Sequence, residues 1–249
     1  MIDLISGLLF ICIGIAAGFV GGVAGGGGGL ISVPAMIFAG LPANMAIATN
    51  RFGCFGYGVS STYKLHKSKN IMYKHVIPLT IFGVAGALVG TKILIDINAE
   101  LLSKIVGILL IIALGSIFIN PKFGLKEHIL SKGRAWLTYA AYFGVGVYDG
   151  FFGVAGGIFS MLLIVHGLKT TFLKAHGTDN IPWFIGLLIT MPILFFNGLI
   201  DVPIAIMLII GMFIGGWIGS HTAIKKGNKF VKFVFALVVI ASAIKLLFF

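Results

Sequence analysis

The sequence predicts an all-α integral membrane protein made of two tandem repeats, each with about five hydrophobic segments. Three observations support this fold class. Hydrophobic residues make up 59% of the 249 residues and charged residues only 10%, against roughly 25% charged in a soluble domain. Apolar runs alternate with short polar loops along the whole chain. Two of these runs are interrupted by glycine clusters at matching places in the two halves.

A bilayer core is crossed by about 20 consecutive apolar residues in a helix. Loops marked by charged residues and by Pro, Gly and Asn clusters divide the chain into ten hydrophobic segments. The segments cover residues 3–24, 29–40, 44–63, 75–95, 102–120, 135–153, 156–168, 176–198, 202–221 and 230–249. The second and the seventh are too short to cross the bilayer as untilted helices, and each follows a glycine cluster.

The first of these clusters is the run of glycines at residues 25–29, within the stretch GGGGGLISVP. Each glycine costs a helix about 1 kcal/mol relative to alanine, so the helix is expected to break here. Non-helical backbone at membrane depth is tolerated where protein buries it or a watery cavity solvates it. We therefore expect a short helix after Gly29. The N–H groups of Gly28 and Gly29 and the positive end of its dipole would face an anion.

The same pattern returns in the second half at a nearly constant offset of about 130 residues. The matching landmarks are Gly22–Gly25 with Gly153–Gly156, Gly29–Ser32 with Gly157–Ser160, Gly40-Leu41 with Gly167-Leu168, Asn50 with Asn180, and Gly86 and Gly90 with Gly215 and Gly219. This predicts a first repeat over residues 1–122 and a second over residues 123–249. Gly156 and Gly157 are then expected to face the anion with their N–H groups, as Gly28 and Gly29 do in the first half.

The topology follows from the positive charges. Most of the 18 Lys and Arg residues lie in four loops, at residues 64–74, 122–134, 169–174 and 225–232. If these loops are cytoplasmic, the N-terminus lies outside and each half has five segments, so the halves are inverted. The alternative treats each short segment and its neighbour as a re-entrant hairpin, which leaves four spans per half and parallel halves. It places a basic loop on the wrong side and is disfavoured.

Arg51 is the only arginine inside an expected span, where a charge costs at least about 2.5 kcal/mol. It lies close to the turn at Asn44, so one reading is that it snorkels to the outer interface. The other reading is that it binds an anion in a cavity. Asp149 and Asp179 are the carboxylates inside expected spans, and either could neutralise Arg51 or take and release a proton during transport.

Polar residues at matching places form a second group of candidates. Thr49 and Asn50 would meet Thr178 and Asn180 if the halves are inverted, and their hydroxyls and amides could hydrogen-bond an oxyanion. The alternative is that they join helices by hydrogen bonds, as in many helix bundles. Trp136, Tyr139 and Tyr142 near a basic loop are interpreted as an interfacial belt. Small-residue faces are expected to allow close helix packing, at Gly83, Gly86, Gly90, Gly211, Gly215 and Gly219.

Several function classes are disfavoured. The net charge of +11 comes from loops between apolar runs, so nucleic-acid binding is not expected. The chain has no HExxH motif, no GK[ST] after the glycines and no CxxC spacing. An enzyme, a metal site and a cofactor are therefore not expected.

The stretch GFVGGVAGGGGGLISVPAM, the tripeptide Ala48-Thr49-Asn50, and GVYDGFFGVAGGIFS with GTDN at mid-chain resemble the TauE/SafE sulfite exporter family, also called the sulfonate uptake permease superfamily. The resemblance covers essentially the whole chain. Members often have a proline after the glycine of the second motif, where this chain has Val154-Ala155-Gly156-Gly157. The resemblance implies a carrier for small sulfur-containing anions and leaves substrate and direction open.

Together these observations predict a secondary transporter for sulfite, sulfoacetate or another organosulfonate, in the cytoplasmic membrane of a prokaryote. The substrate is expected between the two broken segments. The expected substrate site comprises Gly28, Gly29, Thr49, Asn50, Arg51, Gly156, Gly157, Thr178 and Asn180, with Asp149 or Asp179 as the coupling group. The expected partners are the anion, the lipid bilayer and a proton or sodium ion, and a homodimer stays open. A passive anion channel and a scaffold subunit without transport are the alternatives.

Overall fold

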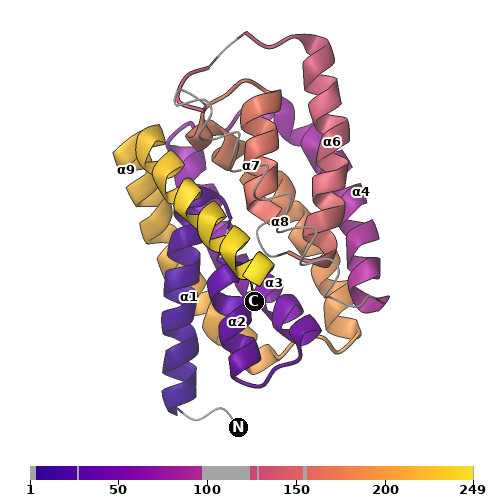
Figure 1. Cartoon of the computed structure of the whole chain (residues 1–249), viewed down its shortest axis with the longest axis vertical. Helices are drawn as coiled ribbons and strands as arrows, with labels where there is room; N and C mark the ends of the chain where they lie inside the picture. Colours follow the sequence, from indigo (N-terminus) through magenta and orange to yellow (C-terminus); the bar gives the residue numbers. More distant parts are fainter. Residues whose placement is uncertain (1–3, 27, 97–123, 128, 154–155, 249) are drawn as a thin grey trace.

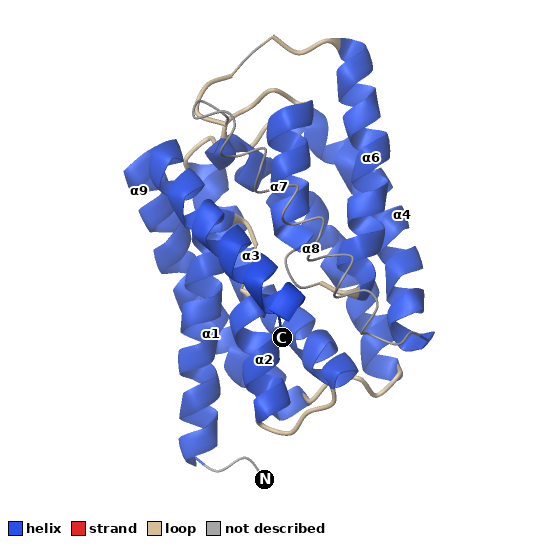
Figure 2. Ribbon diagram, viewed as in Figure 1, coloured by secondary structure: helices blue, strands red, loops and turns tan. Residues whose placement is uncertain are grey.

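The computed structural model describes residues 4–26, 28–96, 124–127, 129–153 and 156–248, and it is helical with short turns throughout this part (Figures 1 and 2). The helices are α1 (Leu4–Ala24), α2 (Gly29–Phe38), α3 (Ala43–Lys67), α4 (Tyr73–Asp96), α6 (Lys132–Phe151), α7 (Gly156–Gly167), α8 (Phe172–Phe196) and α9 (Val202–Phe248). The all-α prediction is confirmed for the described residues. The expected segment at residues 102–120 lies outside them.

Within the described ranges, four helices contain stretches long and apolar enough to cross a membrane: Gly7–Ala24 in α1, Tyr73–Leu94 in α4, Phe172–Phe196 in α8 and Val202–Val238 in α9. The two short segments expected from the glycine clusters are confirmed as the short apolar helices α2 and α7. In Figure 1 both run away from the middle of the molecule, α2 towards the end that holds the N-terminus and α7 towards the opposite end.

Helix α9 contains both of the last two expected segments. The backbone angles of Gly227, φ 74° and ψ −172°, are not helical. This residue therefore divides α9 into two helical arms. The second arm folds back towards the middle of the molecule (Figure 1, yellow). Left-handed φ values are accessible mainly to glycine, which explains why the chain reverses at this residue.

Glycine stripes hold two helix pairs in close contact, as the sequence predicted. A Cβ atom added to Gly86 or Gly90 of α4 would overlap backbone atoms of α6, at Phe143 and Val147. In the second pair, formed by α9 and α1, Gly215 stands in the same relation to Ile15. Because glycine has no side chain, these backbones can touch. Such close van der Waals packing stabilises helix pairs in a membrane, where the hydrophobic effect does not drive helices together.

The arrangement of these pairs agrees with the predicted repeat. Each pair joins one helix from each half, and the contacts of α1 with α9 correspond to those of α6 with α4. Figure 1 shows α1 and α6 running in opposite directions along the long axis, which an inverted repeat requires. The inverted repeat itself stays a prediction, and its boundary at residues 122 and 123 lies outside the described residues.

The interpretation of three aromatic residues as an interfacial belt is wrong for two of them. Trp136 is 63% exposed, but Tyr139 and Tyr142 are buried. Both hydroxyls find partners on neighbouring helices: Tyr139 lies 2.5 Å from His75 Nδ1, and Tyr142 donates to Asp179. A buried partner satisfies the polar tip that would otherwise favour the membrane interface.

Candidate functional site

The two glycine breaks touch each other through their backbones. Gly25 follows α1 with φ 71° and Gly153 follows α6 with φ 67°, so both helices end in the left-handed conformation that glycine favours. A Cβ atom on Gly26 would lie 2.7 Å from the Cα atom of Gly157, and one on Gly157 would overlap the Gly25 carbonyl oxygen. The two broken segments are therefore in contact, as the expected position of a substrate between them requires.

A small cavity lies at this contact. It measures about 30 Å³, and its lining includes Gly28, Gly29, Asn50, Asp149 and Gly157. Helix α2 begins here, and among the described residues no side chain caps its N-terminus. The first N–H groups of a helix have no partner within the helix, so α2 directs free donors and the positive end of its dipole to this region.

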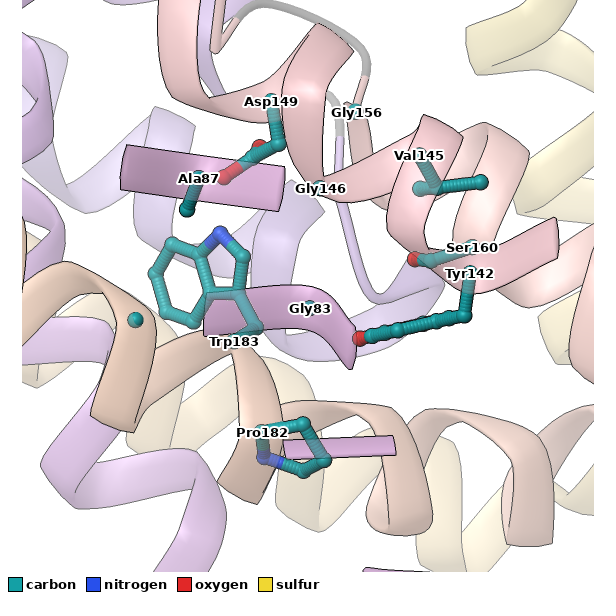
Figure 3. Close-up of a pocket in the computed structure, with 11 residues that line it drawn as sticks. Gly83, Ala87, Tyr142, Val145, Gly146, Asp149, Gly156, Ser160, Pro182 and Trp183 are labelled. Atoms are coloured by element: carbon teal, nitrogen blue, oxygen red, sulfur yellow. The ribbon is translucent and has the colours of Figure 1, made fainter. Parts of the chain in front are cut away.

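A second cavity of about 20 Å³ lies beside the first (Figure 3). Its lining includes Tyr142, Asp149, Gly156, Ser160 and Trp183. A cavity needs about 10–15 Å³ of such volume to hold one water molecule. Each cavity therefore has room for one or two waters, so the structure represents a closed state with respect to a small oxyanion.

Asp149 stands between the two cavities. Its side chain and that of Trp183 belong to both linings. Figure 3 shows the indole nitrogen of Trp183 directed at the Asp149 carboxylate. A Cβ atom on Gly156 would overlap Asp149 Oδ1. The carboxylate thus lies against the first residue of α7, the end of a helix that attracts negative charge.

Arg51 is buried, with 4% of its surface exposed, so the snorkelling interpretation is wrong. Its Nη1 donates to the carbonyl oxygens of Asp149 and, at 2.9 Å, of Gly150, and its Nη2 donates to Thr190 Oγ1 at 3.1 Å. Nη2 also lies 4.0 Å from the Asp149 carboxylate. Among the described residues, Nε has no hydrogen-bond partner. Arg51 therefore binds the negative end of α6 and lines neither cavity.

The two halves share one arrangement of hydrogen bonds at the cavities. Ser32 Oγ donates to Asn50 Oδ1 at 2.5 Å, and Ser160 Oγ lies 2.7 Å from Asp179 Oδ2. The sequence matched Asn50 with Asn180, but by these contacts its counterpart is Asp179. Asp179 precedes Asn180 by one residue. When the match is shifted by this one position, Arg51 corresponds to Asn180. The expected alignment is corrected by one position because the serine donor, and not the residue type, defines equivalence.

The remaining polar candidates join helices to loops. Thr49 Oγ1 accepts a hydrogen bond from the Asp201 N–H, and Thr178 Oγ1 accepts one from the Met72 N–H, both at 3.0 Å. Asn180 Nδ2 donates to Thr62 Oγ1 at 2.7 Å, while its Oδ1 is buried without a described partner. These side chains line neither cavity, which favours the alternative that they hold helices together.

Sequence reasoning missed Trp183, Tyr142 and the two serines as parts of the site. The serines carried a signal, because Ser32 and Ser160 occupy matching places after the two glycine clusters. Trp183 carried none, since a single aromatic residue in an apolar run does not reveal which helix face it occupies.

Comparison with known proteins gives a consistent result. The family model described as "Sulfite exporter TauE/SafE" matches residues 10–246. A probable membrane transporter protein, ORF9, from a Sinorhizobium species is 31% identical over 232 residues, covering 93% of this chain and 88% of the relative. The probable membrane transporter protein YfcA of Escherichia coli K12 is 29% identical over 255 residues, covering 98% of this chain and 90% of the relative. No solved structure matches.

Proposed function

This chain belongs to the sulfite exporter TauE/SafE family, and we propose that it is a secondary transporter that moves a small sulfur-containing anion by alternating access. The family and the relatives make it a multi-pass membrane transporter and not an enzyme. Sulfite, sulfoacetate and other organosulfonates are the proposed substrates. The proposed location is the cytoplasmic membrane of a prokaryote, with the N-terminus outside.

One observation carries the proposal: two broken helices begin at the same small cavity. The lining holds Gly28 and Gly29 at the start of α2 and Gly157 at the start of α7. Backbone N–H groups at helix N-termini bind oxyanions without requiring a cationic side chain. In transporters with repeats, substrates bind where discontinuous helices present such ends to each other.

The resident charges fit this role. The Asp149 carboxylate lies at the start of α7, the position an anionic substrate would take. In the proposed cycle the substrate displaces this carboxylate towards Arg51, 4.0 Å away. Arg51 then neutralises the displaced Asp149, and its charge acts on the substrate through that residue.

The closed cavities favour a carrier over an open pore. Volumes of about 20 and 30 Å³ leave no room for an oxyanion, so the helices that bound them have to move before substrate enters. The glycine breaks at the starts of α2 and α7 supply backbone that can change its φ and ψ angles. A proton or sodium ion is the proposed coupling ion. A homodimer is the proposed assembly.

The proposal is tested by transport of labelled sulfite, sulfoacetate and taurine in proteoliposomes. A carrier gives saturable uptake, and uptake is faster when the same anion is present inside. Uptake that rises linearly with concentration and ignores the internal anion would establish a channel instead. Absence of flux for every anion would leave the scaffold alternative.

A further inference from the structure

We propose that Asp179 is the proton-binding site of the transport cycle and that Asp149 is not. The inference rests on the proposed function, because it assigns the coupling ion and its residue within that transporter. It is carried by the hydrogen bonds around the two carboxylates and by the comparison of the two halves.

The two carboxylates have different neighbours. Asp149 has a cation close by, the Arg51 guanidinium at 4.0 Å, and the indole nitrogen of Trp183 is directed at it (Figure 3). Asp179 is 2% exposed and accepts hydrogen bonds from Tyr142 Oη at 2.6 Å and Ser160 Oγ at 2.7 Å. No described cationic side chain contacts it. Neutral hydroxyls do not cancel its charge, and a buried charge without a partner is neutralised by binding a proton or another cation.

The first half shows what the neutral state of Asp179 looks like. Asn50 occupies the corresponding position and accepts the same hydrogen bond from Ser32 that Asp179 accepts from Ser160. An amide has the shape of a protonated carboxyl group and carries no charge. The fold therefore accepts a neutral side chain at this place, and the second half has an ionisable one there.

Ser160 connects Asp179 to the anion cavity, the cavity lined by Gly28, Gly29 and Gly157. Its Oγ lies 2.7 Å from Asp179 Oδ2 and 3.1 Å from the Gly157 carbonyl oxygen, so its single hydrogen can go to either. When Asp179 is ionised, the hydroxyl donates to the carboxylate. When a proton from water binds Oδ2, that O–H donates to Ser160 Oγ, and the serine hydrogen turns to Gly157. Gly157 lines the anion cavity and touches Gly26, so protonation changes the hydrogen bonding of the backbone there.

Other titratable groups near Asp179 do not replace it in this role. Tyr142 of α6 donates a hydrogen bond to it, and Asp149 of α6 and Tyr57 of α3 lie close enough to interact with it electrostatically. His176 lies one turn earlier on α8, and its Nε2 is directed at Ser61 Oγ, 3.5 Å away. A sodium ion is disfavoured, because each carboxylate oxygen of Asp179 already has a hydroxyl group within hydrogen-bond distance, Tyr142 at Oδ1 and Ser160 at Oδ2.

The test compares Asp179→Asn with the wild type in proteoliposomes. A pH gradient is expected to change wild-type anion flux about fivefold or more, the usual range of coupling between two sites. Asp179→Asn should bind anion and fold, because Asn50 shows that an amide fits, but its flux should not respond to the gradient. His176→Gln and the exposed His221→Gln should keep the response. A sodium gradient should have no effect on any of them.

The outcomes separate the two proposals. Saturable wild-type flux that ignores the pH gradient or follows sodium would overturn the inference and leave the proposed function standing. Retained pH response in Asp179→Asn, or its loss in His176→Gln alone, would also overturn it. Infrared difference spectra on a pH change give a readout that needs no transport. A protonated-carboxyl band should appear in the wild type and in Asp149→Asn and be absent from Asp179→Asn, and any other pattern counts against the assignment.

Discussion

The backbone of Gly157 packs directly against the carbonyl group of Gly25, so that any side chain at Gly157 would overlap it. The two residues lie in different halves of the chain. Gly25 lies between α1 and α2, and Gly157 is the second residue of α7. Their contact is the point where the helices around the candidate anion cavity meet.

Gly157→Ala is expected to lower both stability and transport, because the new methyl group meets backbone atoms that cannot rotate away as a side chain can. Overpacking of this kind costs about 1–3 kcal/mol. Thermal unfolding in detergent and saturable anion uptake measure the two effects. Gly144→Ala in α6 is the matched control, since a Cβ atom there meets nothing within 4 Å. Equal behaviour of the two variants would contradict the packing argument.

Arg51→Ala is expected to destabilise the protein by about 3–5 kcal/mol, the usual cost of removing one partner of a buried ion pair. The substitution leaves the Asp149 carboxylate and the carbonyl groups at the end of α6 without their donor. Adding Asp149→Asn should restore part of the loss, because the unpaired charge is then gone. Denaturant unfolding of the single and double variants measures this, and strictly additive effects would argue against the pair.

Trp183→Phe is expected to slow transport more than it lowers stability. An aromatic ring is kept, while the indole N–H group directed at Asp149 is lost. Loss of one hydrogen-bond donor costs about 0.5–1.5 kcal/mol. Because the pair borders both cavities, its loss should alter the release of the carboxylate from α7. Uptake rates and anion affinity, measured side by side, separate this from a general loss of folding. An unchanged rate and affinity would remove Trp183 from the mechanism.

Gly90→Ala is expected to separate α4 from α6, since its methyl group would overlap the Val147 carbonyl oxygen. Gly186→Ala in α8 should be tolerated, because the nearest atom, the Cβ of Ala87, would lie 3.8 Å away. The unfolding temperatures of the two variants in detergent test the contrast. A Gly90→Ala protein as stable as Gly186→Ala would show that the close approach is not required.

Composition and glycine patterns were sufficient to predict the helical fold and the two short helices. A run of five glycines removes so much helix propensity that no packing around it was needed to infer the break. The close packing at Gly86 and Gly215 was likewise readable, because small residues at helical spacing have one main use in membranes.

The site was only partly predictable, because contacts between distant segments decide it. The environment of Arg51 depends on where α6 ends, 98 residues later in sequence, and no local pattern gives that distance. The one-residue error that matched Asn50 with Asn180 arose because the residue type agreed, whereas the hydrogen bond from Ser160 selects Asp179. The substrate roles proposed for Thr49, Thr178 and Asn180 remain predictions, although their contacts now favour helix joining.

The position of the Trp183 indole beside Asp149 also provides an optical reporter. Of the three tryptophans, Trp136 and Trp217 are exposed at 63% and 39%, while the indole nitrogen of Trp183 is directed at the carboxylate that the substrate would displace. Movement of that carboxylate should alter the emission of Trp183 alone. Titration of a protein carrying Trp136→Phe and Trp217→Phe with sulfite would follow binding without a label. Constant emission during saturable binding would show that the carboxylate stays in place.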